Sequence, residues 1–184
     1  MKRFLLILLS LIFCLSLVAC NKNGANEEIP VGTEVGNKLP DLEVSVFDEN
    51  GLTGEKINPS KTGKVTVVNF WGTWCVYCLR ELPYFDEIAS EYSESVSFVA
   101  IHSVAYFSET AVDYVNANYK DSNIIFAKDT SLDSGEDKAY STLGGEGYYP
   151  YTLILDANGV ITYKTSGQIP ESVLISEIEK ALGN

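Results

Sequence analysis

Residues 69–78 read Asn69-Phe70-Trp71-Gly72-Thr73-Trp74-Cys75-Val76-Tyr77-Cys78. The residues before Trp71, from position 65 to 70, are almost continuously apolar, a pattern typical of a central strand covered on both faces. A Cys-x-x-Cys pair at the start of a following helix puts the first sulfur near unpaired backbone N–H groups, which favour a thiolate. Because a thiolate is the attacking species in disulfide exchange, we interpret this segment as a redox site.

Helical periodicity follows the two cysteines. Apolar residues recur at intervals of three and four, namely Leu82, Phe85, Ile88, Ala89 and Tyr92. The polar positions of this predicted helix are Arg80, Glu81, Glu87 and Glu91. The sequence therefore predicts a strand, a redox turn and an amphipathic helix in direct succession.

The rest of the chain alternates between strand and helix patterns. We predict strands at residues 42–46, 96–101, 124–127, 151–155 and 160–164, and helices at residues 108–119, 138–143 and 171–182. Turn residues at 48–51 indicate an N-terminal hairpin. With 184 residues, 46% of them hydrophobic, this order predicts one α/β domain with a mixed sheet and helices on both faces.

The N-terminus has the pattern of a signal peptide. Lys2 and Arg3 precede an apolar run from position 4 to 19, which ends in Leu17-Val18-Ala19-Cys20. This ending resembles the bacterial lipobox, which implies that Cys20 becomes the lipidated first residue of the mature protein. We expect a signal peptide at 1–19, a lipid-anchored tether at 20–36 and a folded domain at 37–184. The alternative is an uncleaved anchor helix, and both readings place the domain outside the cytoplasm.

Cysteine count and charge narrow the function. Removal of residues 1–19 discards Cys14 and lipidation occupies Cys20, so Cys75 and Cys78 remain. The loop that a Cys75–Cys78 disulfide would close is too short to lower the entropy of the unfolded chain by much, so a structural disulfide is the weaker interpretation and catalysis the better one. The net charge of −12 makes nucleic acid an improbable partner and disfavours electrostatic binding to an anionic membrane.

Three motifs resemble those of membrane-anchored thioredoxin-like proteins of the TlpA/ResA type. They are Leu39-Pro40-Asp41-Leu42, the Trp74-Cys75-Val76-Tyr77-Cys78 segment with its flanks at 67–71 and 81–83, and Tyr149-Pro150-Tyr151-Thr152-Leu153-Ile154-Leu155-Asp156 with Gly159. The resemblance covers roughly residues 36–182. It implies a thioredoxin-like fold with an N-terminal β-hairpin and a central insertion.

The resemblance also implies roles for the two cysteines. Cys75 would be the exposed nucleophile that attacks a partner disulfide, and Cys78 the buried sulfur that resolves the mixed disulfide. Glu81 matches a carboxylate that could accept the Cys78 proton, although a solvated helix carboxylate is the alternative. Ordinary thioredoxins carry a buried aspartate where this chain has Asn69, which cannot titrate.

The substrate side of the implied site lies elsewhere in the chain. Pro150 matches the family's cis-proline, which faces the cysteine pair, and Tyr149 would touch the substrate. Trp74 would form part of the docking surface beside Cys75.

The family implies an extracytoplasmic oxidoreductase, lipid-anchored to the bacterial cell membrane and needing no cofactor or metal. Its clients would be disulfides of exported proteins, such as apo-cytochrome c, and its electrons would come from an integral-membrane thiol carrier. Val76-Tyr77 replaces the dipeptides of ordinary thioredoxins and of strong oxidants, so an oxidase of exported thiols remains an alternative.

Two other classes share the fold. A Sco-like copper lipoprotein would use two cysteines and a histidine, but its cysteines are three residues apart, and His102 is expected to be a core or strand-end residue. A peroxiredoxin needs a threonine three residues before its peroxidatic cysteine, where this chain has Gly72.

Overall fold

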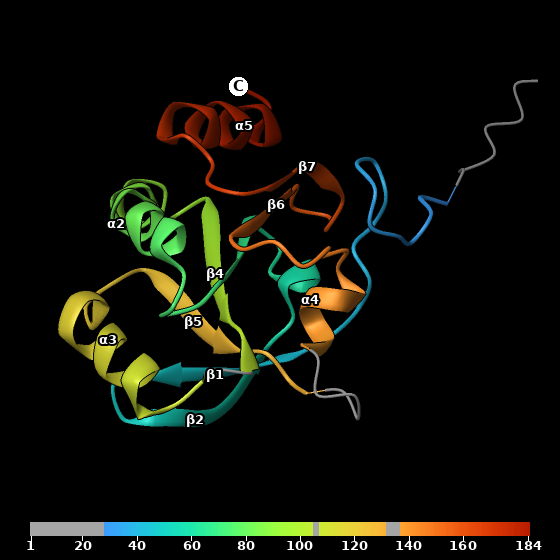
Figure 1. Ribbon diagram of the computed structural model, residues 1–184. Helices are drawn as coiled ribbons and strands as arrows, with labels where there is room; N and C mark the ends of the chain where they lie inside the picture. The colour runs from blue at the N-terminus through green and yellow to red at the C-terminus, as the bar shows by residue number, and fades with distance from the viewer. Residues whose placement is uncertain (1–27, 105–106, 132–136) are drawn as a thin grey trace, which may run out of the picture.

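The computed structural model describes residues 28–104, 107–131 and 137–184 (Figure 1). The expected signal peptide, Cys20 and the first part of the expected tether lie outside the described residues. None of residues 28–36 is buried. The Gly36 backbone N–H nevertheless donates to Ile161 O at 2.8 Å, and Lys164 Nζ donates to Glu34 Oε1 at 2.9 Å, so this segment lies against the domain. Within the described ranges, no helix combines the length and apolar character that crossing a membrane requires.

The elements occur in the predicted order. The strands are β1 (Val44–Asp48), β2 (Gly51–Ile57), β3 (Val65–Trp71), β4 (Val96–His102), β5 (Ile124–Lys128), β6 (Tyr151–Leu155) and β7 (Ile161–Ser166). The helices are α2 (Val76–Glu91), α3 (Glu109–Tyr119), α4 (Lys138–Thr142) and α5 (Glu171–Leu182), and the short 3-10 helix η1 (Pro59–Lys61) was not predicted. Ser108 caps α3 as expected, because its side chain accepts a hydrogen bond from the Thr110 backbone N–H.

The sheet is mixed, as predicted, with the strand order β2-β1-β5-β4-β3-β6-β7. β3, β4 and β5 are parallel, whereas β1 pairs antiparallel with β5 and β6 pairs antiparallel with β3. The α3–β5 unit follows β4 and precedes α4, in the middle of the folded domain. β5 separates β4 from the N-terminal hairpin of β1 and β2, so this unit widens the sheet on one side of the redox strand.

β3 is the centre of the fold, and all seven of its residues are buried. Successive side chains of a strand point to opposite faces of the sheet. Val67 and Trp71 accordingly belong to one hydrophobic cluster, and Val68 and Phe70 to the other. This alternation directs Asn69 to the same face as Val67 and Trp71.

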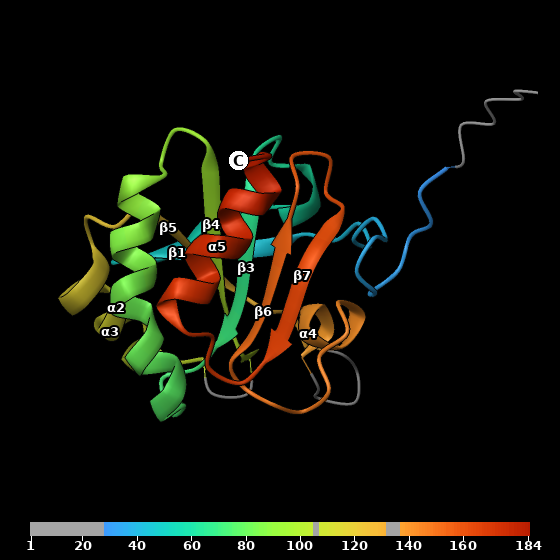
Figure 2. The same cartoon turned by 90° about the horizontal axis from the view of Figure 1, so that it is seen from above.

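Helices cover both faces, but unequally. The cluster that contains Trp71 also holds buried residues of α2, α3 and α5, and Figure 2 shows α5 crossing in front of the central strands. The opposite cluster holds Ala139 and Tyr140 of α4 together with Leu39 from the N-terminal segment. The redox helix α2 therefore packs on the more heavily covered face of the sheet.

The N-terminal strand departs from simple alternation. The sequence predicts that Val44 and Val46 share a face, yet the buried residues of β1 are Val44 and Phe47. The register between β1 and β2 shifts between Ser45 and Phe47, as in a β-bulge. The extra residue turns Phe47 into the core, where its ring meets Phe107 edge to face at 5.0 Å.

Gly159 gives a stability prediction. Its φ of +80° lies in the left-handed region, and a Cβ built on it would lie 2.5 Å from the backbone oxygen of Ser60. We expect Gly159→Ala to lower the free energy of unfolding by about 2 kcal/mol, because backbone strain and a backbone clash add. Urea denaturation measures this, with Gly147→Ala as the control, since Gly147 has φ +86° but no atom within 4 Å of its Cβ position. Equal losses in both variants would show that the contact with Ser60 is unimportant.

Candidate active site

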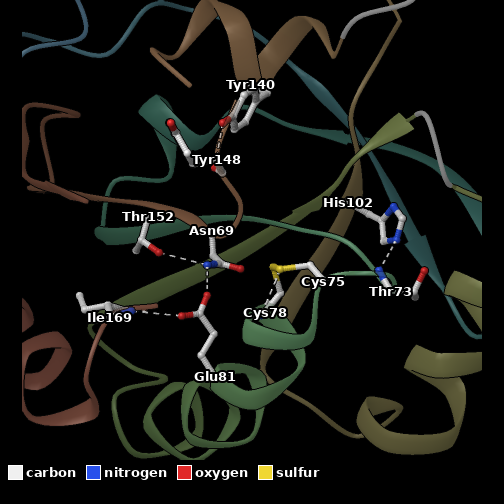
Figure 3. Close-up of a disulfide and its surroundings, with 10 residues drawn as sticks. All are labelled: Asn69, Thr73, Cys75, Cys78, Glu81, His102, Tyr140, Tyr148, Thr152 and Ile169. Carbon is white, nitrogen blue, oxygen red and sulfur yellow. Dashed lines mark hydrogen bonds between the residues drawn. A yellow bond between two sulfur atoms is a disulfide. The ribbon is translucent and has the colours of Figure 1, made fainter. Parts of the chain in front are cut away.

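The two cysteines form a disulfide at the start of α2 (Figure 3). Cys75 is the N-cap residue, and its Sγ accepts a hydrogen bond from the Cys78 backbone N–H at 3.2 Å. This is the predicted contact between the first sulfur and an unpaired N–H of the first helical turn. Cys75 is 5% exposed and Cys78 is 0% exposed. The expectation of an exposed Cys75 needs correction for the disulfide form, because its sulfur is tied to the inward-facing Cys78, yet Cys75 is the more accessible of the two.

A tight turn joins β3 to the cysteines. The Cys75 backbone N–H donates to Gly72 O at 2.9 Å, which closes the turn. A Cβ at Gly72 would lie 2.6 Å from Trp74 Nε1, so the absence of a side chain at this position lets the indole lie over the turn. The Trp74 side chain remains 46% exposed beside Cys75.

Tyr149 joins this aromatic surface. Its ring meets Trp74 edge to face at 5.2 Å and stacks on Tyr140 at 4.6 Å. The Tyr149 hydroxyl donates to Asp137 Oδ2 at 2.8 Å. Burial and the nearby Asp137 carboxylate raise the pKa of Tyr149 far above its ordinary value, so the hydroxyl stays protonated. The rings of Trp74, Tyr149 and Tyr140 therefore form one aromatic cluster beside the disulfide, and the hydrogen bond to Asp137 holds Tyr149 in it. Asp137 was not identified from the sequence.

Pro150 has the peptide geometry that the resemblance implies. The Tyr149–Pro150 peptide bond is cis, which confirms that prediction. Tyr151 pairs with Phe70, so Pro150 is one residue beyond the paired segment, at the end of β3 that leads into the redox turn. Pro150 is buried, and its carbonyl accepts a hydrogen bond from the Gly167 backbone N–H at 2.7 Å.

Glu81 is buried on the inner face of α2, with 0% of its surface exposed. Its Oε1 accepts from Asn69 Nδ2 at 2.7 Å, and its Oε2 accepts from the Ile169 backbone N–H at 3.3 Å (Figure 3). Asn69 Nδ2 also donates to Thr152 Oγ1 at 3.1 Å. The alternative of a solvated helix carboxylate is therefore wrong, and so is the assignment of Glu81 to the polar face of the helix.

Burial decides the protonation of Glu81. Loss of water raises its pKa from 4.5 to about 7, and the hydrogen bonds from Asn69 and Ile169 offset only part of this effect. A carboxyl group with a pKa near neutrality can both accept and return a proton at physiological pH. Glu81 lies three residues after Cys78, and residues at this spacing share one face of a helix.

Two hydrogen-bond partners around Glu81 and Asn69 could not be identified from the sequence. Thr152 lies opposite Asn69 only because β6 pairs antiparallel with β3 in this register. Ile169 contributes a backbone N–H, which no side-chain pattern marks. Asp137 accepts from the Ser103 hydroxyl and the Val104 backbone N–H as well as from Tyr149, and no local pattern connects it with these residues, which lie at least 12 positions away in the sequence.

His102 is the last residue of β4 and is fully buried, as expected of a strand-end histidine. Its Nε2 accepts from the Thr73 backbone N–H at 3.1 Å, and its Nδ1 donates to Ser103 O at 2.7 Å. This pattern requires the neutral ring. Burial lowers its pKa below the ordinary 6.5, although the Ser103 carbonyl and the Asp137 charge act in the other direction. His102 thus supports the turn that carries Trp74 and Cys75.

We predict that His102→Leu lowers the free energy of unfolding by about 1 kcal/mol, because the Thr73 N–H loses its acceptor. His102→Gln should retain most of the stability, since its amide oxygen can replace Nε2. Because the folded protein holds His102 neutral, its contribution is complete above about pH 6.5 and is lost as the pH falls below that value. Urea denaturation at two pH values measures this, and an unchanged difference between wild type and His102→Gln would contradict it.

The donors in the described ranges do not assemble a metal site of the Sco kind. Both ring nitrogens of His102 are engaged by backbone groups. No group of three or more histidine, cysteine, aspartate or glutamate residues within these ranges is arranged to hold a metal ion.

Comparison with known proteins agrees with this geometry. The Redoxin family matches residues 34–182. The chain is 31% identical over 133 residues to the thioredoxin-like protein YneN of Bacillus subtilis, covering 71% of each chain. It is 28% identical over 151 residues to the thiol-disulfide oxidoreductase ResA of Bacillus cereus, covering 80% of this chain and 78% of ResA.

Solved structures show the same fold. The exposed lipoprotein thioredoxin of Streptococcus pneumoniae superposes with a TM-score of 0.60 at 23% identity, covering 77% of this chain and 99% of that one. The sequence match, the family relatives and the Cys75–Cys78 disulfide at a helix start lead to one conclusion. The chain belongs to the Redoxin family and is a thiol-disulfide oxidoreductase of the ResA type.

Proposed function

We propose that the protein reduces disulfides of exported proteins while anchored by lipid outside the cytoplasm. The supporting observation is the surface around Cys75, where Trp74 is 46% exposed and Val76 and Tyr77 are each 58% exposed. Large apolar side chains grouped beside a reactive sulfur fit a protein client better than a small anionic thiol. Apo-cytochrome c is one candidate client, and an integral-membrane thiol carrier is the candidate electron donor.

In the proposed cycle, the Cys75 thiolate attacks a client disulfide, and the displaced client sulfur takes a proton. Cys78 then gives its proton to Glu81 and attacks Cys75 Sγ, which releases the client as a dithiol and leaves the Cys75–Cys78 disulfide. Two electrons pass to the client, and a dithiol donor restores them. Trp74, Tyr149 and Pro150 contact the client segment beside Cys75.

The direction of electron flow is tested by the reduction potential. The full-length chain with Cys14→Ser and Cys20→Ser is equilibrated in glutathione buffers, so that only the Cys75–Cys78 pair titrates. A reductase should have a potential near that of thioredoxin, about −270 mV, whereas a potential near about −120 mV would indicate an oxidase of exported thiols.

The anchor has its own test. The proposal assigns residues 1–19 to a signal peptide, Cys20 to the lipid-bearing first residue and residues 20–36 to the tether of the domain at 37–184. Cells fed labelled palmitate should label the wild-type protein and the Cys75→Ser control, and Cys20→Ala should remove the label. A label that persists in Cys20→Ala would contradict lipidation at Cys20.

A further inference from the structure

The carbonyl oxygen of Asn69 is buried without a hydrogen-bond donor from the described residues. The side chain is 1% exposed, and no atom of the described ranges donates a hydrogen bond to Oδ1. The orientation of the amide is set by its two donated hydrogen bonds, because Nδ2 donates to Glu81 Oε1 at 2.7 Å and to Thr152 Oγ1 at 3.1 Å. A buried acceptor without a partner costs free energy, so a state of the protein that supplies a donor is favoured relative to this one.

The position of Oδ1 indicates which state that is. Figure 3 shows the Asn69 amide between the Glu81 carboxylate and the disulfide, with Nδ2 turned toward Glu81 and Oδ1 on the side of the sulfurs. Cys78 and Glu81 lie one helical turn apart on the same face of α2. Cys78 is 0% exposed, so after reduction its thiol hydrogen cannot reach bulk water and needs an acceptor within the protein.

We propose that Asn69 is a positioning residue whose Oδ1 accepts a hydrogen bond from the Cys78 thiol in the reduced protein, while its Nδ2 holds Glu81. A dithiol partner supplies two electrons and the medium supplies the protons, so that the sulfur–sulfur bond becomes two thiols. The Cys78 hydrogen stays on sulfur and is only shared with Oδ1. This inference rests on the proposed role of Cys78 as the buried resolving sulfur.

An amide suits this position better than a carboxylate does. Asn69 can offer a donor to Glu81 and an acceptor to Cys78 at the same time, whereas an ionised aspartate would place a second negative charge against Glu81. The bond exists only in the dithiol form, because a disulfide has no hydrogen to donate. Asn69 therefore favours the dithiol and makes the pair less strongly reducing than it would otherwise be.

The first test detects the hydrogen bond directly. In the full-length chain with Cys14→Ser, Cys20→Ser and Cys75→Ser, Cys78 is the only thiol. Its infrared S–H stretching band should lie at lower frequency than that of a free thiol, and Asn69→Ala should return it to the free-thiol position. Thr152→Val is the matched control, because it removes the other partner of Nδ2 and should leave the band in place. If the band has the same frequency in this chain with and without Asn69→Ala, the proposal is overturned. That result would also be obtained if water, and not Asn69, were the acceptor of the Cys78 hydrogen bond.

The second test measures the redox equilibrium and separates a direct effect on Cys78 from an effect through Glu81. In the Cys14→Ser, Cys20→Ser chain, Asn69→Ala should shift the equilibrium toward the disulfide about fivefold, or roughly 20 mV to lower potential. Thr152→Val should shift it less than about twofold, and the Asn69→Ala effect should persist when Glu81 is replaced by Leu. Loss of the effect in Glu81→Leu would show that Asn69 acts only through Glu81.

Neither test requires a client or a membrane partner. A failure to find the proposed client would therefore leave the result on Asn69 standing. Far-UV circular dichroism verifies that each variant is folded. Should Asn69→Ala be unfolded, Asn69→Ser provides the same comparison, since its shorter hydroxyl side chain cannot place an acceptor at the Oδ1 position.

Discussion

Cys75→Ser is expected to abolish disulfide reduction, with a loss of at least about a thousandfold. The reason is that a serine hydroxyl stays protonated at neutral pH and is a much weaker nucleophile than a cysteine thiolate. The N-cap position and the Cys78 N–H stabilise charge on sulfur at Cys75. Reduction of insulin by the purified full-length chain measures this loss.

Cys78→Ser should behave differently. The first attack by Cys75 can still occur, but the buried serine cannot resolve the product, so a mixed disulfide between Cys75 and the client accumulates. Non-reducing gels and mass spectrometry of the native membrane fraction identify the trapped client, and the Cys75→Ser, Cys78→Ser double variant is the control. A client trapped by Cys75→Ser through Cys78 would reverse the two assigned roles.

Glu81→Gln is the second change for which we expect a large effect. Glutamine can fill the same space but cannot take the Cys78 proton, so resolution of the mixed disulfide should slow by about a hundredfold. In the wild type, the rate of resolution should rise with pH and level off above about 7, where Glu81 is ionised. Stopped-flow measurement of mixed-disulfide decay gives the profile. The same inflection in Glu81→Gln would exclude Glu81 as the proton acceptor.

The same substitution should change stability in a pH-dependent way. The folded disulfide form has a Glu81 pKa of about 7, above the ordinary 4.5, so it binds more protons than the unfolded chain between these values. The Glu81 contribution to stability is therefore fully present below about pH 4.5 and is lost as the pH rises through about 7, a change of about 3 kcal/mol.

Denaturation of the oxidised protein tests this sign. Relative to wild type, Glu81→Gln should gain stability between about pH 4.5 and pH 8. Glu87→Gln is the matched control, since Glu87 is an exposed carboxylate on the same helix and should show no such gain. A wild type that becomes more stable relative to Glu81→Gln across this window would refute the raised pKa.

Much of the fold follows from local sequence. The apolar run of β3 predicts a strand buried on both faces, Ser108 predicts the start of α3, and the Cys-x-x-Cys spacing predicts a first cysteine at a helix start. The cis bond before Pro150 follows from a motif rather than from general preference, because most X–Pro bonds are trans. Each of these features depends on residues that are only a few positions apart in the sequence.

The chemistry of the site depends on contacts that the sequence alone does not specify. The sequence pattern predicts that Glu81 occupies the polar face of its helix. The structure shows instead that Glu81 is buried between α2 and the sheet, where it accepts a hydrogen bond from Ile169, 88 residues away, and burial raises its pKa to about 7. Asn69 meets Thr152 across 83 residues through strand pairing. The sequence by itself determined the redox pair, its helix and the order of elements. Tertiary structure decided how deeply each polar group is buried and what faces it, because burial and strand register join residues that no local pattern connects.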